Sequence, residues 1–219
     1  MNSVLTPFYR LITMMFKLIP YFFKRETEQS DRLILRDYDN CCDEILDADL
    51  LLYRNRGVIS LVGRGDYSHC GKAAWWGNEL FSLEVREFYG GRAVKLRDQV
   101  ARYHGKIDVF RANPGNRWSG YRRDKATEVM RSFAGCDYGY WNVIIAAATH
   151  LPILRLFFTI KNGDDLCDAT RMPPFCSQAC AYADRVGGGV DPVPYLSDRF
   201  TEPSDLARSV FYEYLFTLK

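Results

Sequence analysis

The chain has 219 residues and a formal net charge of +2, and 47% of its residues are hydrophobic and 15% aromatic. This balance excludes an intrinsically disordered chain, which has a larger charge imbalance and fewer aromatic residues, and it provides no bulk attraction to nucleic acid. Seven cysteines in a chain of this length exclude a short disulfide scaffold, and the three histidines restrict any catalytic or metal-binding imidazole to His69, His104 or His150.

The first predicted element is a cationic amphipathic helix over residues 4–24. Arg10, Lys17 and Lys24 recur every seven residues and therefore fall on one helical face, with apolar residues on the remainder. Its uncharged runs are far shorter than the roughly 20 residues that span a bilayer, and it lacks the small-residue cleavage site of a signal peptide. We expect it to dock on the domain or on a partner protein, with a membrane interface as the alternative.

The remaining elements follow in chain order. Short β-rich segments bounded by glycines predict strands at 49–54, 58–63, 68–76, 79–87, 92–96 and 106–112. Helical spacing predicts helices at 97–104, 121–134, 139–160, 176–186 and 203–217, the last with Ser204 as its N-cap. Because most strands precede most helices, the sequence predicts an α+β fold with an antiparallel sheet packed against helices. Residues 1–44 would form the N-terminal helix and a charged linker, and residues 45–219 one domain.

The predicted hairpin at 68–87 brings two polar residues together. If Gly77 and Asn78 form a two-residue turn, Gly71 faces Glu84 across the hairpin. His69 then lies diagonal to Glu84 on the same face of the sheet, within reach of its carboxylate. Such a carboxylate fixes the tautomer of the imidazole and stabilises the imidazolium. An ordinary salt-bridged histidine on a half-exposed strand is the alternative interpretation of this pair.

Cys176 follows Pro173-Pro174-Phe175 and opens the predicted helix 176–186. The free N–H groups and the positive end of a helix lower the pKa of a thiol placed there and favour the thiolate, and the same N–H groups can hold an oxyanion. A buried helical cysteine is the alternative, which Cys180 fits better. The chain has no CxxC pair, GxGxxG or P-loop pattern, so we expect no metal and no nucleotide cofactor.

These pieces resemble a known family. The string SHCGKA at 68–73 resembles the "SHVGI" histidine strand of the NlpC-type papain-like superfamily, and FCSQACAYA at 175–183 resembles its "DCSG/YCSE" nucleophile helix. Standard enzymes place the cysteine first, whereas here the order is His69, Glu84, Cys176. That order resembles the circularly permuted branch, the YiiX-like proteins and the lecithin:retinol acyltransferase relatives. DADLLLYR at 47–54 resembles the opening strand of this branch, with Ala48 where glycine is usual.

The resemblance covers roughly residues 45–215 and implies a role for each site residue. Cys176 would be the nucleophile, and His69 the base that activates it and later protonates the leaving group. Glu84 would orient the histidine. In the stretch AGCDYGY, Tyr138 matches the family's oxyanion tyrosine, with Tyr140 as a substitute.

A Cys–His pair performs acyl transfer through a thioester, and the family contains cell-wall peptidases as well as lipid acyltransferases. We therefore predict a cysteine hydrolase of amide bonds, with peptidoglycan peptides as the leading substrate class. The alternatives are a thiol acyltransferase or lipid hydrolase of the same fold, and a structural protein of a larger particle such as a virion. Cys70 stands beside His69 where the family usually has an aliphatic residue, and it could be modified. His104 is the reserve base.

The cysteine count bears on the compartment. An odd number of cysteines, two of them adjacent, predicts mostly free thiols in a reducing environment. A cytoplasmic location, membrane association and transport within a larger particle are all compatible with it.

Overall fold

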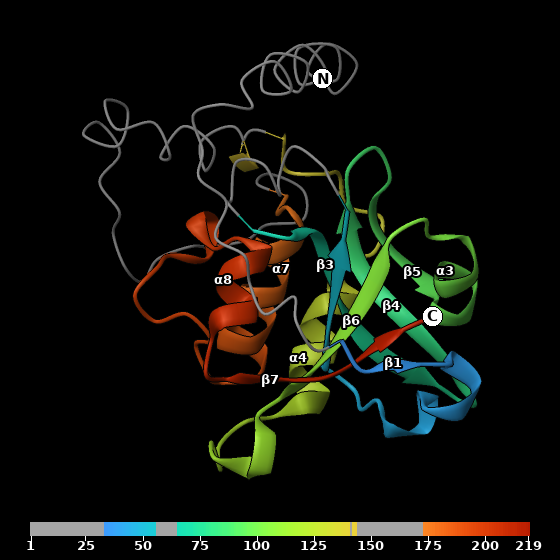
Figure 1. Ribbon diagram of the computed structural model, residues 1–219. Helices are drawn as coiled ribbons and strands as arrows, with labels where there is room; N and C mark the ends of the chain where they lie inside the picture. Colours follow the sequence, from blue (N-terminus) through green and yellow to red (C-terminus); the bar gives the residue numbers. More distant parts are fainter. Residues whose placement is uncertain (1–32, 56–64, 141, 144–172) are drawn as a thin grey trace.

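The fold is built on a seven-stranded sheet. A computed structural model of the chain describes residues 33–55, 65–140, 142–143 and 173–219. The strands lie in the order β1-β7-β6-β2-β3-β4-β5 (Figure 1). All neighbouring strands are antiparallel except the β1–β7 pair. Their bounds are β1 Leu35–Arg36, β2 Leu50–Arg54, β3 Tyr67–Trp76, β4 Glu79–Arg86, β5 Gly90–Lys95, β6 Lys106–Ala112 and β7 Tyr212–Leu218.

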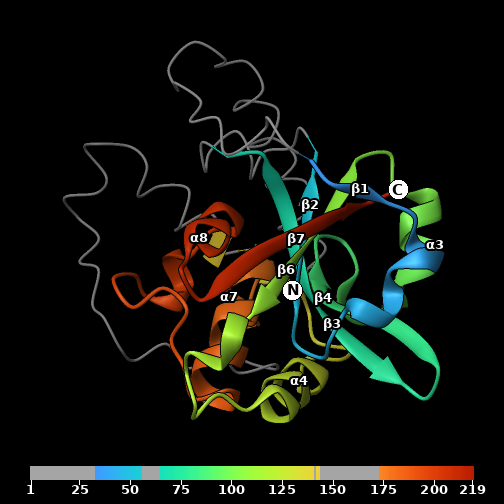
Figure 2. The same ribbon diagram turned by 60° about the horizontal axis from the view of Figure 1, so that its bottom comes forward.

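Helices cover the two faces of the sheet unequally. Three helices, α4 (Arg123–Ser132), α7 (Cys176–Tyr182) and α8 (Pro203–Arg208), lie on the same side of it, which is called the α7 face below (Figures 1 and 2). Helix α3 (Leu96–Arg102) packs with the core of the other side, the α3 face. A π-helical turn, η4 (Ala183–Gly187), continues α7, and 3-10 helices lie at Tyr38–Asn40, Cys42–Glu44, Pro114–Asn116 and Asp198–Phe200. The predicted α+β class is confirmed, whereas the permuted papain-like connectivity stays a prediction.

The central strand β2 is apolar along most of its length because both of its faces are covered. Leu50 and Leu52 belong to the core on the α7 face, whereas Leu51 and Tyr53 belong to the core on the α3 face. All four side chains are fully buried. Successive side chains of a strand point to opposite faces, so an uninterrupted apolar run is what a strand covered on both sides requires.

The β3–β4 hairpin positions the candidate site. Gly77 and Asn78 form the predicted two-residue turn, and the left-handed φ of Gly77, 58°, suits glycine there. The pairs run from Trp76–Glu79 to Lys72–Leu83, which is the predicted register. Both described strands continue past Lys72–Leu83 without forming further pairs with each other. The two strands therefore separate at this end of the hairpin.

Most predicted elements are confirmed. They are the strands at 49–54, 68–76, 79–87, 92–96 and 106–112 and the helices at 97–104, 121–134 and 176–186. The strand predicted at 58–63 and the amphipathic helix at 4–24 lie outside the described residues, as does nearly all of the helix predicted at 139–160. Among the described residues, no helix combines the length and apolar character needed to cross a membrane.

The helix predicted over 203–217 is wrong in its second half. Helix α8 ends at Arg208, and the chain then forms β7, which pairs with β6 and β1. Ser204 is not the N-cap, because the helix begins at Pro203 and Glu202 occupies the cap position. Apolar residues stand at alternate positions through β7, and this period of two is a strand signal that the helical interpretation overlooked.

The chain joins the sheet ahead of residue 45. Leu35 pairs with Thr217 of β7, and Cys41 and Ile45 are buried in the core on the α3 face. The described part of the segment 25–44 therefore packs on the sheet. The division of the chain into residues 1–44 and 45–219 stays a prediction.

Candidate active site

His69 and Glu84 are in contact at the end of the hairpin where β3 and β4 separate. The Nε2 atom of His69 lies 2.7 Å from Oε2 of Glu84. Gly71 faces Glu84 across the hairpin, since a Cβ at Gly71 would lie 3.3 Å from Cβ of Glu84 and 2.8 Å from the carbonyl oxygen of Leu83. The glycine therefore leaves the carboxylate the space to reach the imidazole, as the sequence predicts.

Glu84 is a buried carboxylate that its neighbours keep ionised. Its Oε1 atom accepts a hydrogen bond from Nε of Arg92, the residue opposite it in β5, at 2.8 Å. A nitrogen of the Arg86 guanidinium lies 3.8 Å from the same oxygen. Burial raises the pKa of Glu84, but the charge and hydrogen bond of His69, together with the two arginines, outweigh burial and bring this pKa to about 2.

Cys176 is the first residue of α7, as predicted, and is fully buried. Its sulfur is hydrogen-bonded to the ring of His69 and to the side chain of Cys70, and it accepts a further hydrogen bond from the backbone N–H of Cys70. Cys70 lies on β3 beyond the last β3–β4 pair, so its N–H has no partner strand on that side. The Cys176 sulfur therefore lies against β3 at a position where β4 no longer pairs with it.

The pKa values of the Cys176 thiol and the His69 imidazole are shifted in the directions that favour an ion pair. The hydrogen bond from Cys70 lowers the pKa of Cys176, burial opposes it, and the hydrogen bond and charge of His69 assist it, so that this pKa lies well below its ordinary value. Burial lowers the pKa of His69, but Glu84 and Cys176 together raise it to about 9. A thiolate beside an imidazolium is the state in which a cysteine is nucleophilic near neutral pH.

Two neighbours of this group were missed in the sequence. Tyr53 stands opposite His69 in β2, with its ring centroid 5.0 Å from the imidazole centroid, and its hydroxyl is hydrogen-bonded to Ser82 and Gln99. Arg92 is the second. Both could have been found by pairing the predicted strands, because each lies directly opposite a site residue in the neighbouring strand.

Tyr138 lies in the same buried core as α7, with its ring centroid 4.9 Å from that of Tyr140. Between them, Gly139 donates its N–H to the carbonyl of Pro174 at 3.0 Å, so this stretch runs beside the residues that lead into α7. The hydroxyl of Tyr140 accepts the N–H of Phe88 at 2.9 Å, which directs it to the β4–β5 turn. An oxyanion role for Tyr138 stays a prediction.

The other candidates lie apart from the His69–Cys176 contact. His104 is exposed just after α3, and His150 lies outside the described residues. Cys180 is fully buried one turn after Cys176, as expected of a packing cysteine. Within residues 33–55, 65–140, 142–143 and 173–219, no group of three or more His, Cys, Asp or Glu side chains is arranged to hold a metal ion.

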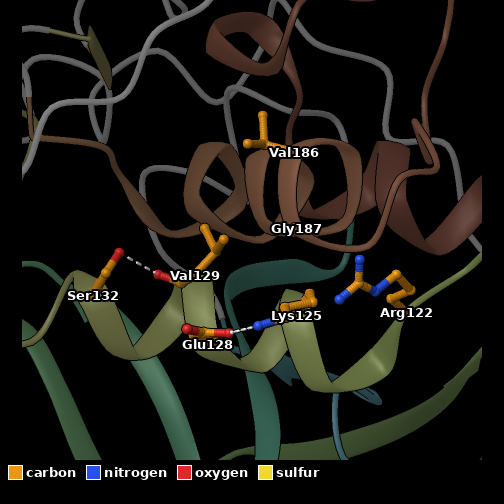
Figure 3. Close-up of a pocket in the computed structure, with 7 residues that line it drawn as sticks. All are labelled: Arg122, Lys125, Glu128, Val129, Ser132, Val186 and Gly187. Carbon is orange, nitrogen blue, oxygen red and sulfur yellow. Dashed lines mark hydrogen bonds and ion pairs between the residues drawn. The ribbon is translucent and has the colours of Figure 1, made fainter.

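A pocket of about 450 Å³ lies between α4 and the π-helical turn η4 (Figure 3). Two of its residues, Lys125 and Glu128, form an ion pair of 2.6 Å. None of the predicted site residues lines it. The lining residues are Arg122, Lys125, Glu128, Val129, Ser132, Val186 and Gly187.

Comparison with known proteins supports the fold. No family model and no curated protein matches the sequence. Among solved structures, the chain is similar to the metalloprotein yiiX from Escherichia coli O157:H7, with a TM-score of 0.52 and 13% sequence identity. The similarity covers 78% of this chain and 96% of the yiiX chain. At this identity the likeness concerns the fold alone, and at that level it agrees with the resemblance to the permuted YiiX-like branch.

Proposed function

We propose that the protein is a cysteine hydrolase that cleaves amide bonds through a thioester intermediate. The observation that carries this proposal is the line of hydrogen bonds from Glu84 through His69 to Cys176, three residues from three separate elements. The pKa of each group is shifted in the direction that the chemistry needs: the shifts favour an ionised carboxyl, a protonated imidazole and a deprotonated thiol. Perturbed groups that converge in this way are typical of catalytic sites.

In the first half of the reaction, the Cys176 thiolate attacks the carbonyl carbon and forms a carbon–sulfur bond. The carbonyl electron pair moves to the oxygen, which the N–H groups of the first turn of α7 and the Tyr138 hydroxyl would stabilise. When the carbon–nitrogen bond breaks, the His69 imidazolium donates its proton to the leaving amine. The acyl group remains on the sulfur as a thioester.

In the second half, neutral His69 takes a proton from water, and the water oxygen attacks the thioester carbon. The carbon–sulfur bond breaks, and the sulfur leaves as the thiolate beside the restored imidazolium. Glu84 stays ionised throughout and holds the ring in one orientation, as the carboxylate of a catalytic triad does.

No step of this proposed mechanism uses a metal. The similar structure, yiiX, is that of a metalloprotein. In the described part of this chain, no three His, Cys, Asp or Glu side chains form a suitable donor group, and the His69 and Cys176 side chains are already bonded to each other and to Glu84 and Cys70. The donors that the described residues supply therefore do not fit a metal centre at this site.

Peptidoglycan peptides are the proposed substrate class, on the resemblance to cell-wall peptidases. A lipid substrate is the second candidate, and one surface feature favours it. Phe88 and Tyr89 are 49% and 67% exposed at the β4–β5 turn, close along the chain to Glu84, and the Arg92 guanidinium lies 4.2 Å from the Tyr89 ring centroid. Exposed aromatic rings flanked by basic residues suit a membrane interface.

The deciding experiment compares wild type with Cys176→Ala on purified peptidoglycan and on acyl lipids. Cys180→Ala is the matched control, because it removes a buried thiol from the same helix. We expect wild type and Cys180→Ala to release muropeptides and Cys176→Ala to release none. Activity on lipid alone would select the second candidate. Inactivity of folded wild type on both would contradict the hydrolase and favour an assembly role.

Labelling provides a test that needs no substrate. At about pH 6 an ordinary thiol is almost fully protonated, so iodoacetamide should label Cys176 faster than Cys180. Equal rates at the two sites would contradict the proposed nucleophile.

A further inference from the structure

A second thiol faces the proposed nucleophile. Cys70 on β3 and Cys180 on α7 are fully buried in the same core as Cys176. The side chain of Cys70 is hydrogen-bonded to the side chains of both Cys176 and Cys180, and all three cysteines are free. The sulfur of Cys70 is therefore held against the sulfur that the proposed reaction uses, although the reaction gives Cys70 no bond to make or break.

Of the two pairs that include Cys176, Cys70–Cys176 is the better placed to form a disulfide. A disulfide requires Cβ atoms about 3.5–4.5 Å apart. Cys176 and Cys180 stand one turn apart on a helix, where Cβ atoms are about 5–6 Å apart and the side chains run parallel. Cys70 approaches from a different element, and both its thiol and its backbone N–H contact the Cys176 sulfur.

We propose that Cys70 is the resolving cysteine of a reversible Cys70–Cys176 disulfide, which forms when a peroxide oxidises Cys176. In the first step, the Cys176 thiolate attacks one peroxide oxygen. A sulfur–oxygen bond forms, the oxygen–oxygen bond breaks, and the second oxygen leaves as water after taking a proton from His69. The product is a sulfenic acid, and the peroxide has accepted two electrons.

In the second step, the sulfur of Cys70 attacks the sulfur of Cys176. The sulfur–sulfur bond forms, the sulfur–oxygen bond breaks, and the oxygen leaves as a second water with the thiol proton of Cys70. An external dithiol reverses the reaction by thiol–disulfide exchange and restores the thiolate. The disulfide blocks the nucleophile and keeps Cys176 from the irreversible sulfinic state.

The environments of the two thiols fit this order of events. Cys176 has the lowered pKa and reacts first as the thiolate. Burial raises the pKa of Cys70, so it stays a neutral thiol that does not compete for the peroxide. Hydrogen peroxide is a suitable probe because it is small and uncharged and oxidises thiolates to sulfenic acids.

The test is to treat folded protein with hydrogen peroxide, block the remaining thiols and map linked peptides by mass spectrometry. We expect a Cys70–Cys176 linkage in wild type and in the control Cys180→Ala. Iodoacetamide labelling of Cys176 should be lost in proportion to this linkage and should return with dithiothreitol. In Cys70→Ala and Cys70→Ser, Cys176 should pass to the sulfinic acid, and its labelling should not return.

Three results would overturn the proposal: a Cys70–Cys180 linkage, no linkage at all, or full recovery of Cys176 labelling in both Cys70 variants. The proposal rests on the proposed function only in taking Cys176 as the reactive thiol, because the linkage is read without substrate. A reactive Cys176 that forms no linkage defeats this inference alone. A linkage in a protein inactive on every substrate leaves this inference standing and defeats the hydrolase.

Discussion

Replacing Glu84 by Gln removes the negative charge beside His69 while keeping the side-chain volume and one carbonyl oxygen. The two groups are 2.7 Å apart and both are buried, so solvent screens their interaction weakly. Burial by itself lowers the pKa of His69, and the charge of Glu84 is the largest of the effects that raise it. We therefore expect Glu84→Gln to lower the pKa of His69 and weaken the thiolate–imidazolium pair.

The expected effect of Glu84→Gln can be worked out from the shift in the pKa of His69. The pKa of His69 rises from 6.5 to about 9 in the folded protein. Each pKa unit corresponds to about 1.36 kcal/mol, so this rise represents roughly 3 kcal/mol in favour of the imidazolium. Because Cys176 supplies part of the rise, we expect Glu84→Gln to remove roughly 1–2 kcal/mol, or about one pKa unit or more.

Nuclear magnetic resonance of the histidine ring protons measures this directly, because only His69, His104 and His150 contribute and His69→Asn assigns the signal. In wild type, the His69 signal should titrate near pH 9, and in Glu84→Gln at a lower pH. The alkaline limb of the proposed hydrolysis should move to lower pH with it, since in that proposal the imidazolium donates the proton to the leaving group.

The matched control is Glu79→Gln, an exposed carboxylate on the same strand that pairs with Lys95 at 3.3 Å. It makes the same chemical change at the far end of β4 and should leave the His69 titration unchanged. A wild-type midpoint near the ordinary value, or the same midpoint in wild type and Glu84→Gln, would refute the reasoning.

Three further predictions concern stability, each measured by urea unfolding. The pKa of Glu84 is about 2 in the folded protein against an ordinary 4.5. Its ionisation should therefore contribute roughly 3 kcal/mol to the free energy of unfolding above pH 4.5, and this contribution should be lost as the pH falls to about 2. Glu84→Gln should not show this loss of stability in acid. Gly71→Ala would place a Cβ 2.8 Å from a β4 carbonyl oxygen and should cost roughly 1–3 kcal/mol, whereas Gly120→Ala meets nothing within 4 Å and should cost less. Lys72→Met leaves a buried carboxylate without its 2.6 Å partner and should cost roughly 3–5 kcal/mol, against less than about 1 kcal/mol for Lys125→Met in an exposed pair. A small loss for Lys72→Met would contradict the assignment of that ion pair.

The His69–Glu84 contact could be predicted because local rules determine it. A two-residue turn sets the register of a hairpin, and the period of two then determines which side chains share a face. The approach of Cys176 could not be obtained in this way, since a long stretch of chain separates it from the hairpin and no spacing rule spans that distance. Its place beside His69 was predicted only through the resemblance of short motifs to a known family.

Strand β7, near the end of the chain, shows a different reason why an element was not predicted from the sequence. The predicted helix runs on through residues 209–218 because they follow helix α8 without a glycine or proline. Most of these residues are aromatic or β-branched, however, and such residues favour strands. In the structure they pair with β6 and β1. A shift of register beside Val109 also moves the apolar side chains of β7 from the α7 face, where Tyr212 packs, to the α3 face, where Phe216 packs. A strand that changes faces contributes to two cores, so the alternation along β7 does not show which face of the sheet each side chain meets.

The surroundings of the Cys176 sulfur show how two adjacent residues of one strand, His69 and Cys70, can contact the same atom. His69 lies opposite Tyr53 of the α3-face core, whereas Cys70 belongs to the α7-face core, as the alternation of a strand requires. Both nevertheless contact the Cys176 sulfur, which is possible only at the edge of the strand, where β4 has separated from β3. The β2–β3 register shifts at this point and leaves Ser68 as an extra residue, and bulges of this kind bend a strand and re-aim its side chains. Because this arrangement depends on how three strands bend together, the sequence reveals Cys70 only as a departure from a motif, while the structure places it against Cys176.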